Sequence, residues 1–303
     1  MQKLQKVLKM VRFNSLIATI LPFVLGISFT LYYFNAINIL NTIVFLLICC
    51  LMQMIVNLRD SIKDYDNSKN FAVEQNQDEV FAKIGHDKDL KQFKLLCYAM
   101  ILAGVILALY LVYLTNFIIL ALGLVSTLIG YLYTGGKYPI ENGPLGELFS
   151  GLTMGYIITL ACVLVNIPIS DYSWNLVWKL IFVSGIAIFA IANIMLANNT
   201  CDYDADIKVN RHTFVSYVGK QGALKVYATY YVLGYLLLLA AIILRYLPIE
   251  MLVVFLTIPV IMKNTKKFFA VQVKKETFIL TIKNDVTLLV SSLIGLFIYL
   301  ILK

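Results

Sequence analysis

Long apolar segments separated by short polar ones make up most of this chain. Most of these segments approach the ~20 residues that a helix needs to cross a bilayer, so we predict nine membrane-spanning helices. The predicted spans are residues 13–34, 38–57, 95–115, 117–134, 145–166, 176–197, 222–244, 248–262 and 286–302. This pattern predicts an all-α polytopic membrane protein, in which residues 1–303 form one domain and the helices form a single bundle.

The composition agrees with that pattern. Of the 303 residues, 60% are hydrophobic and 14% are charged, and the mean hydropathy is +0.83, far above that of an average soluble domain. The five cysteines lie in or beside apolar segments without the spacing of a metal site. We interpret them as small buried hydrophobic residues rather than disulfide partners or metal ligands.

Positive charge is concentrated on one predicted side of the membrane. If the N-terminus is cytoplasmic, 22 of the 25 Lys and Arg residues fall on the cytoplasmic side, and the exceptions are Lys179, Arg245 and Lys303. The positive-inside rule therefore predicts a multi-pass plasma-membrane protein with a cytoplasmic N-terminus. The net charge of +8 then reflects topology rather than nucleic-acid binding, and the lysines within 263–285 suit anionic membrane lipid. No obligate protein partner is indicated.

Two polar segments repeat one acidic pattern, Asn-x-x-Asp-x-x-x-Asp, directly after an apolar span. The two copies are Asn57, Asp60, Asp64 and Asn199, Asp202, Asp206, and Asn198 precedes the second copy. We place them in Asp-rich cytoplasmic loops at 57–94 and 198–220. If the preceding helix continues through either copy, its polar side chains share one face.

Repeated carboxylates at this spacing favour a metal site over a merely solvated loop. Mg2+ takes oxygen ligands and is usually bound by one or two carboxylates together with substrate phosphate oxygens. Asp60, Asp64, Asp202 and Asp206 are therefore candidate Mg2+ ligands, with Asp66 as an alternative to Asp64. An apolar bundle with such a site suits a substrate with a charged end and an apolar body, such as a polyprenyl diphosphate.

Three further residues lie close to predicted membrane boundaries. Arg12 follows a basic amphipathic segment, and its position alone suits a topogenic anchor better than a phosphate contact. Lys137 is the sole basic residue of the third cytoplasmic loop, where it would serve as an anchor or neutralise diphosphate charge. Tyr133 suits the aromatic belt of the interface, or, if it faces inward, stabilisation of a carbocation.

The acidic motifs resemble those of a known family. Asn198-Asn199-x-x-Asp202-x-x-x-Asp206 followed by Arg211-x-Thr213 resembles the second signature of the UbiA superfamily of intramembrane aromatic prenyltransferases, and the segment from Asn57 to Asp64 resembles the first. The segments Tyr133-Thr-Gly-Gly-Lys-Tyr-Pro and Gly146-Glu-Leu-Phe are similar to the branch that prenylates 1,4-dihydroxy-2-naphthoate on the way to menaquinone.

This resemblance implies a reaction and residue roles. Asp60, Asp64, Asp202 and Asp206 would bind Mg2+ and the diphosphate, supported by Asn57, Asn198 and Asn199, while Lys137, Arg211 and Arg12 would hold phosphate oxygens. The implied reaction is ionisation of the polyprenyl diphosphate and attack of the allylic cation on a small aromatic acceptor. For dihydroxynaphthoate, carboxylate is then lost to give demethylmenaquinol. In the family, the first signature commonly opens Asn-Asp-x-x-Asp. This sequence departs from that pattern, because Val56 precedes Asn57.

Other functions compete with this interpretation. The nearest keeps the mechanism and changes the acceptor to 4-hydroxybenzoate, haem or another ring. An ion-coupled carrier is a second alternative, although carriers place their acids near the bilayer midplane rather than at helix ends. A lipid phosphotransferase of the CDP-alcohol type is disfavoured because its Asp-Gly and Ala-Arg pairs are absent from the sequence.

Overall fold

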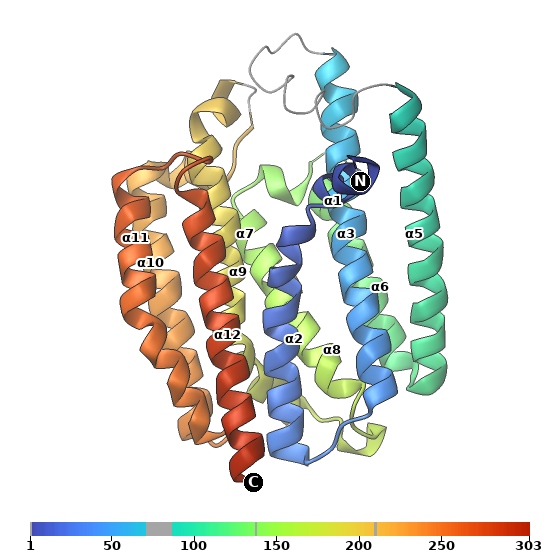
Figure 1. Ribbon diagram of the computed structural model, residues 1–303, viewed down its shortest axis with the longest axis vertical. Helices are drawn as coiled ribbons and strands as arrows, with labels where there is room; N and C mark the ends of the chain where they lie inside the picture. The colour runs from blue at the N-terminus through green and yellow to red at the C-terminus, as the bar shows by residue number, and fades with distance from the viewer. Residues whose placement is uncertain (1, 71–86, 137, 209–210) are drawn as a thin grey trace. The chain divides into compact units, whose positions relative to one another are not determined.

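All regular structure in the described part of the chain is helical (Figure 1). The computed structural model describes residues 2–70, 87–136, 138–208 and 211–303, with side chains from residue 4 to 63 and from residue 89 onward within these ranges. The α-helices are α1 (Gln2–Met10), α2 (Ile17–Phe29), α3 (Ile39–Asn70), α5 (Asp87–Leu114), α6 (Phe117–Thr134), α7 (Gly146–Ser150), α8 (Ile158–Leu164), α9 (Trp174–Lys208), α10 (Phe214–Ile243), α11 (Ile258–Ala270) and α12 (Phe278–Leu302). Over these described ranges the predicted all-α fold is confirmed.

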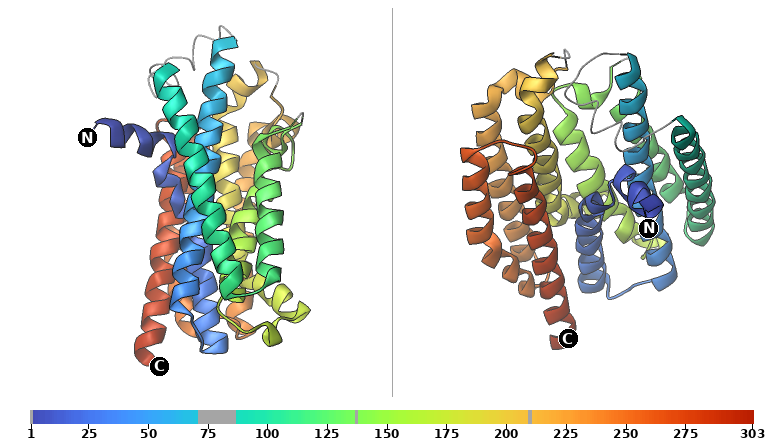
Figure 2. Two further views of the ribbon diagram at one scale, coloured as in Figure 1. Left: turned by 90° about the vertical axis from the view of Figure 1, so that its right-hand side faces the viewer. Right: turned by 45° about the horizontal axis from the view of Figure 1, so that its top comes forward.

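The helices form two compact units. The first contains residues 1–16 and 43–120, and the second contains residues 17–42 and 121–303. In the first unit, α1 runs crosswise to α3 and α5 (Figure 2). Met10 and Val11, at the end of α1, pack into a buried cluster with Leu58 of α3 and Phe93 of α5. The hydrophobic residues of the basic segment thus dock it against the long apolar helices.

The second unit is organised around α9. This helix packs against α10, α12 and α2, and α12 also contacts α2 and α11. In the right-hand view of Figure 2, α10, α11 and α12 group together in orange to red. The middle of α9 is buried, with Leu180, Val183 and Ala187 at 0% exposure. A helix that is apolar on all sides is expected at the centre of such a bundle.

Two glycines allow the segment before α8 to approach α9 closely. Gly151 and Gly155 lie four residues apart in a π-helical segment, Gly151–Ile157, that joins α7 to α8. A Cβ atom added to Gly155 would lie 2.6 Å from the backbone N and Cα of Ile188 on α9. Small residues at this spacing let membrane helices pack backbone against backbone.

Buried polar side chains also link the helices of the second unit. The Asn193 amide on α9 donates a hydrogen bond to the backbone oxygen of Tyr227 on α10, at 3.0 Å. The hydroxyls of Tyr227 and Thr281 are hydrogen bonded at 2.9 Å, and the Asn284 amide donates to the Tyr231 hydroxyl at 3.1 Å. These bonds satisfy polar groups that would otherwise be buried without partners.

Most of the predicted spans overlap a long apolar helix among the described residues, and one does not. Eight helices among the described residues are long and apolar enough to cross a membrane. The predicted span 248–262 is instead a 3-10 segment, Ile249–Thr257, followed by the start of α11. The number nine and the side of the N-terminus therefore stay predictions. Many apolar helices nevertheless indicate a multi-pass membrane protein.

The Asp-rich segments that we expected to be loops are largely helical over their described residues. The first copy of the motif lies on α3, which runs to Asn70, and the second lies on α9, which runs to Lys208. Neither 57–70 nor 198–208 contains Gly or Pro, so nothing in these segments stops the helix at the membrane boundary. The lysine-rich stretch 263–285 is likewise divided between the end of α11, a turn and the start of α12.

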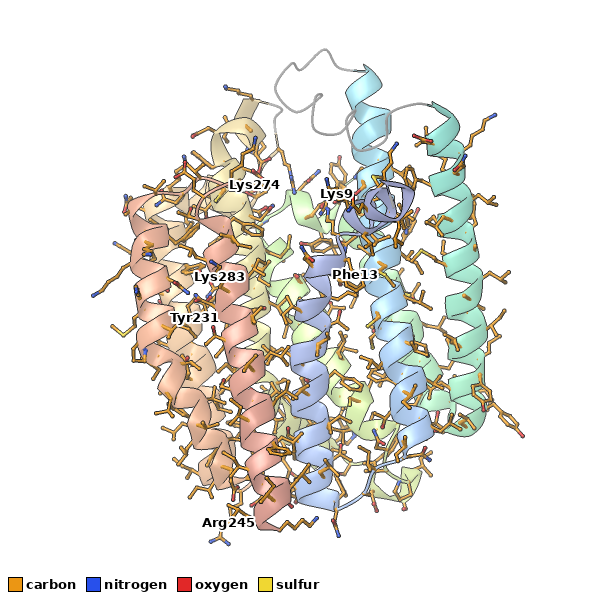
Figure 3. All side chains as sticks on the ribbon, in the orientation of Figure 1. Lys9, Phe13, Tyr231, Arg245, Lys274 and Lys283 are labelled. Atoms are coloured by element: carbon orange, nitrogen blue, oxygen red, sulfur yellow. The ribbon has the colours of Figure 1, made fainter. Side chains whose placement is uncertain are left out.

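Charged residues mark the two ends of the second unit. Figure 3 shows Lys274, in the turn before α12, at the end where α9 finishes, whereas Arg245 lies at the opposite end. The second motif therefore lies at the end of this unit that also carries Lys274.

Candidate functional site

In the first unit, Asn57 joins α3 to the segment after α1. Its side-chain amide donates hydrogen bonds to the backbone oxygen of Val11 at 3.1 Å and to the Ser15 hydroxyl at 2.8 Å. One turn later, the Ser61 hydroxyl donates to the backbone oxygen of Met10 at 3.1 Å. The polar face of α3 thus holds the chain around residue 12 in place.

This anchoring brings Arg12 onto Asp60. The Arg12 guanidinium lies 2.6 Å from the Asp60 carboxylate. Arg12 has a φ angle of 48°, a left-handed conformation that is uncommon for residues other than glycine and that ends α1. The sequence favoured an anchor role for Arg12 from its position alone, but the structure places its charge on the first motif. The side chains of Asp64 and Asp66, and all of Lys137, lie outside the described residues.

In the second unit, the second motif occupies the C-terminal turns of α9. Asn199 and Asp206 are buried, at 2% and 6% exposure, while Asn198 and Asp202 are half-buried. The Asn198 amide donates to the side-chain oxygen of Asn199 at 3.5 Å. The preceding helix thus continues through the second copy of the motif, which is the condition for its polar side chains to share one face.

Arg211, just beyond α9, folds back onto the motif. Its backbone N–H donates to the backbone oxygen of Asp206 at 2.9 Å, and its guanidinium lies 3.5 Å from the Asp206 carboxylate. The same guanidinium donates to the Asn142 side-chain oxygen at 3.0 Å and lies 3.8 Å from the Glu141 carboxylate. A planar guanidinium suits this role because its donors spread over several acceptors at once.

Lys274 supplies a second cation to the motif. Its ammonium forms an ion pair with Asp202 from the turn between α11 and α12. Two residues further along α9, the exposed Asp204 pairs with Lys220 at 2.7 Å. Asp202 and Asp204 thus carry separate ion pairs, although they are near neighbours in sequence.

Glu147, in the first turn of α7, contacts the motif from another side. It is 2% exposed, and one of its carboxylate oxygens accepts a hydrogen bond of 2.8 Å from the Asn199 amide. Glu147, Lys274, Glu141 and Asn142 are not among the site residues predicted from the sequence. For Glu147 a signal existed, because an ionisable residue just inside a predicted membrane span is a candidate functional residue.

The donor set of the second motif fits a hard cation. Asn199, Asp202 and Asp206 offer oxygen ligands only, and one oxygen of Asp206 is buried with no hydrogen-bond partner among the described residues. No group of three His, Cys, Asp or Glu side chains within the described ranges is arranged to enclose a metal by itself. This arrangement agrees with Mg2+ chemistry, in which substrate phosphate oxygens and water complete the coordination.

The remaining candidate, Tyr133, lies half-buried in the last turn of α6. The chain then turns at Gly136, whose φ of 82° is readily adopted only by glycine.

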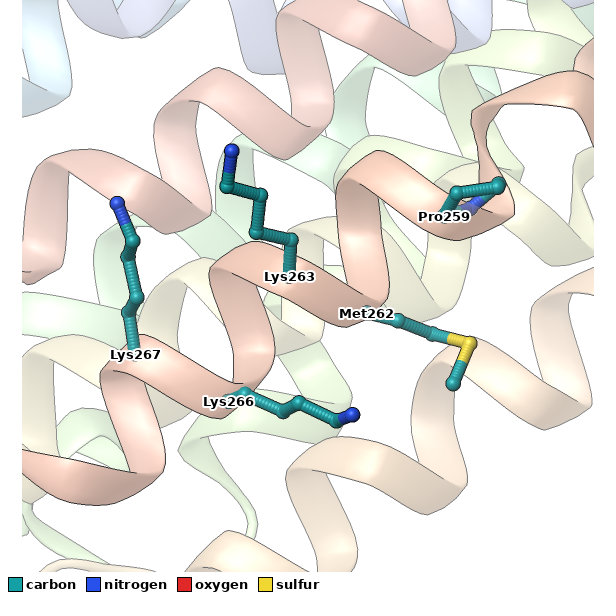
Figure 4. A pocket seen from close by; sticks show the side chains of 5 residues that line it. All are labelled: Pro259, Met262, Lys263, Lys266 and Lys267. Atoms are coloured by element: carbon teal, nitrogen blue, oxygen red, sulfur yellow. The ribbon is translucent and has the colours of Figure 1, made fainter.

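A separate surface depression along α11 is lined by Pro259, Met262, Lys263, Lys266 and Lys267 (Figure 4). These five side chains come from a single helix and include no residue of either motif, so this depression is not the candidate site.

Comparison with known proteins decides the family. The sequence pattern of the UbiA prenyltransferase family matches residues 19–281, which include both acidic motifs. The chain belongs to this family. Among curated proteins, this UbiA family member is similar to the 1,4-dihydroxy-2-naphthoate octaprenyltransferase of Bacillus subtilis (strain 168), with 29% identity over 261 residues. The aligned region covers 86% of this chain and 81% of that protein.

Solved structures have the same fold. A UbiA homolog from Aeropyrum pernix K1 superposes with a TM-score of 0.70 and 17% identity, covering 91% of this chain and 96% of that one. A UbiA homolog from Archaeoglobus fulgidus bound to GPP and Mg2+ superposes with a TM-score of 0.64 and 16% identity, covering 96% and 98%. At these identities the comparison supports the fold of this UbiA family member.

Proposed function

We propose that this protein transfers a polyprenyl group from a polyprenyl diphosphate to 1,4-dihydroxy-2-naphthoate, with loss of carboxylate to give demethylmenaquinol. Family membership makes it a prenyltransferase, and the Bacillus subtilis relative supports this particular acceptor. The proposed site residues are Asp60, Asp64, Asp202 and Asp206 for Mg2+, Asn57, Asn198 and Asn199 in support, and Arg12, Arg211, Lys137 and Tyr133 for the substrate. We propose the plasma membrane as its location, with the site facing the cytoplasm.

The ion pairs at the end of α9 are the strongest support for this function. At the end of α9, Asp202 and Asp206 each lie beside a cation from another segment, Lys274 and Arg211 respectively. Carboxylates provide ligands for a divalent cation, and the Lys and Arg side chains can bind the oxygens of a phosphate anion. A Mg2+–diphosphate needs both kinds of group. A carrier needs no such phosphate-binding cations at a helix end.

The residues of the chain would act on the substrate in three ways. Arg211 and Arg12 would hold the diphosphate with charge-assisted hydrogen bonds, which are stronger than neutral ones. Bound Mg2+ would stabilise the negative charge that develops on the leaving diphosphate. Tyr133 would stabilise the allylic cation through its ring, and the apolar helices would exclude water that could capture that cation.

A direct assay tests this function and its nearest alternative. Purified protein in detergent receives Mg2+ and a labelled polyprenyl diphosphate, with either dihydroxynaphthoate or 4-hydroxybenzoate as acceptor. We expect a prenylated, decarboxylated naphthoquinol in the first reaction and no product in the second. Prenylated hydroxybenzoate alone would replace the acceptor while keeping the transferase function. Absence of any Mg2+-dependent release of diphosphate, with every acceptor tried, would contradict the proposal as a whole.

A further inference from the structure

Glu147 is a buried acid whose placement calls for an explanation. It is the second residue of α7, at the start of a segment that is long and apolar enough to cross the membrane, and it is 2% exposed. Burying a carboxyl group in such a segment is costly unless polar partners compensate. The partner that the structure provides is a residue of the second acidic motif.

The contact between Glu147 and Asn199 determines how the Asn199 side chain is turned. The Asn199 nitrogen donates to Glu147 at 2.8 Å, and both side chains are buried. In the structure the NH2 group of Asn199 faces Glu147, as it must when Glu147 is ionised, because a carboxylate accepts hydrogen bonds and does not donate them. The carbonyl oxygen of Asn199 must then point away. The Asn198 amide reaches that oxygen only at 3.5 Å, the long limit of a hydrogen bond, so the oxygen keeps capacity for another partner.

We propose that Glu147 is a positioning residue that fixes the orientation of the Asn199 carboxamide, so that Asn199 presents its oxygen to the Mg2+–diphosphate. The inference rests on the proposed function, because it requires that the second motif bind this ligand. Glu147 itself does not touch the substrate in this assignment. It acts through one hydrogen bond to a motif residue that lies one turn before Asp202.

Neighbouring residues show that this role belongs to a larger supporting layer. Asn142 and Glu141, which precede α7, hold Arg211 at 3.0 and 3.8 Å, and Arg211 in turn contacts Asp206. Residues 141–147 therefore support the motif directly at Asn199 and, through Arg211, at Asp206. Groups that orient ligands in this way typically change affinity by about 10- to 100-fold when they are removed.

Two conservative variants separate orientation from charge. Glu147→Gln keeps the length of the side chain and one acceptor oxygen but removes the charge, whereas Glu147→Asp keeps the charge and withdraws the carboxylate by one methylene. Gln can present either end of its amide to Asn199, so roughly half the molecules keep the required orientation and the apparent affinity should fall about twofold. For Glu147→Asp we expect about a tenfold loss or more, because the 2.8 Å hydrogen bond is broken.

The probe is inorganic pyrophosphate with Mg2+, titrated against the full chain in detergent by its effect on the unfolding midpoint. Asn193→Leu is the matched control. It removes another buried hydrogen bond of α9, the 3.0 Å bond that the Asn193 amide donates to the backbone oxygen of Tyr227, and Asn193 is not a residue of the motif. This control should unfold at lower temperature but bind the probe with unchanged affinity. Equal affinity of Glu147→Asp and the unaltered protein, or a loss in Glu147→Gln as large as that in Glu147→Asp, would overturn the inference.

A double-mutant cycle adds a second readout. If Glu147 acts through Asn199, then Glu147→Asp should cause little further loss of affinity in a protein that already carries Asn199→Ala. Additive losses would show that Glu147 acts by another route and would refute the assignment. If the unaltered protein itself fails to bind Mg2+–pyrophosphate, the failure lies with the proposed function rather than with the role of Glu147.

Discussion

Arg12 and Asp60 form an ion pair of 2.6 Å that places a cation directly on the first acidic motif. The pair depends on the left-handed backbone conformation of Arg12 and on the hydrogen bonds that Asn57 donates to Val11 and Ser15. A residue that the sequence presented as a membrane anchor is therefore built into the candidate site of its unit.

Arg12→Ala should weaken binding of the prenyl donor. If Arg12 holds phosphate oxygens, losing its charge-assisted hydrogen bonds should raise the KM for polyprenyl diphosphate about tenfold while the KM for the aromatic acceptor changes little. Steady-state kinetics with each substrate varied in turn measures both values. Lys9→Ala, in the same segment, is the control and should leave both constants unchanged. An unaltered donor KM in Arg12→Ala would return this residue to an anchor role.

Asp202→Asn should abolish most turnover, whereas Asp204→Asn should not. Asp202 is assigned to Mg2+ and pairs with Lys274, while the exposed Asp204 pairs with Lys220 at 2.7 Å. Loss of a charge that acts on the developing diphosphate should lower kcat/KM by about 100-fold or more. The two variants remove the same charge from positions within one turn of α9, so they control for net charge and folding. Comparable activity in both would remove the metal assignment of Asp202.

Removal of divalent cations should stop the reaction reversibly. Carboxylate and amide oxygens provide a hard ligand set, so EDTA should abolish product formation and excess Mg2+ should restore it. Ca2+ should restore less activity, since it prefers more ligands at longer distances than Mg2+. Product formation measured by chromatography at fixed donor and acceptor concentrations tests this. Undiminished turnover in chelator would exclude the proposed mechanism.

Gly155→Ala should destabilise the second unit. The added methyl group would lie 2.6 Å from the backbone of Ile188, which cannot move aside as a flexible side chain could. Overpacking of this kind typically costs about 1–3 kcal/mol, so the unfolding midpoint in detergent should fall. Gly123→Ala on α6 is the control, because no atom lies within 4 Å of its added Cβ. Equal midpoints for the two variants would contradict the close approach of this segment to α9.

The membrane helices were the most predictable part of the fold. The predicted span 117–134 coincides with α6, because a long apolar run is bounded there by Asn116 and Gly135. Agreement was poorer for the last helix, which begins at Phe278 rather than at 286. Its first turns contain Asn284 and Asp285, which hydropathy excludes from a span, yet both are 0% exposed inside the unit. Hydropathy cannot recognise polar residues that neighbouring helices cover.

By itself the sequence determined the membrane class, the repeated acidic motif and the resemblance to the UbiA family, because apolar run length and the spacing of Asn and Asp along a helix are local properties. Tertiary structure alone decided which groups meet those motifs. Glu147 reaches Asn199 over 52 positions of sequence, and Lys274 reaches Asp202 over 72. Such contacts follow from how whole helices pack, and no periodicity along the chain encodes them.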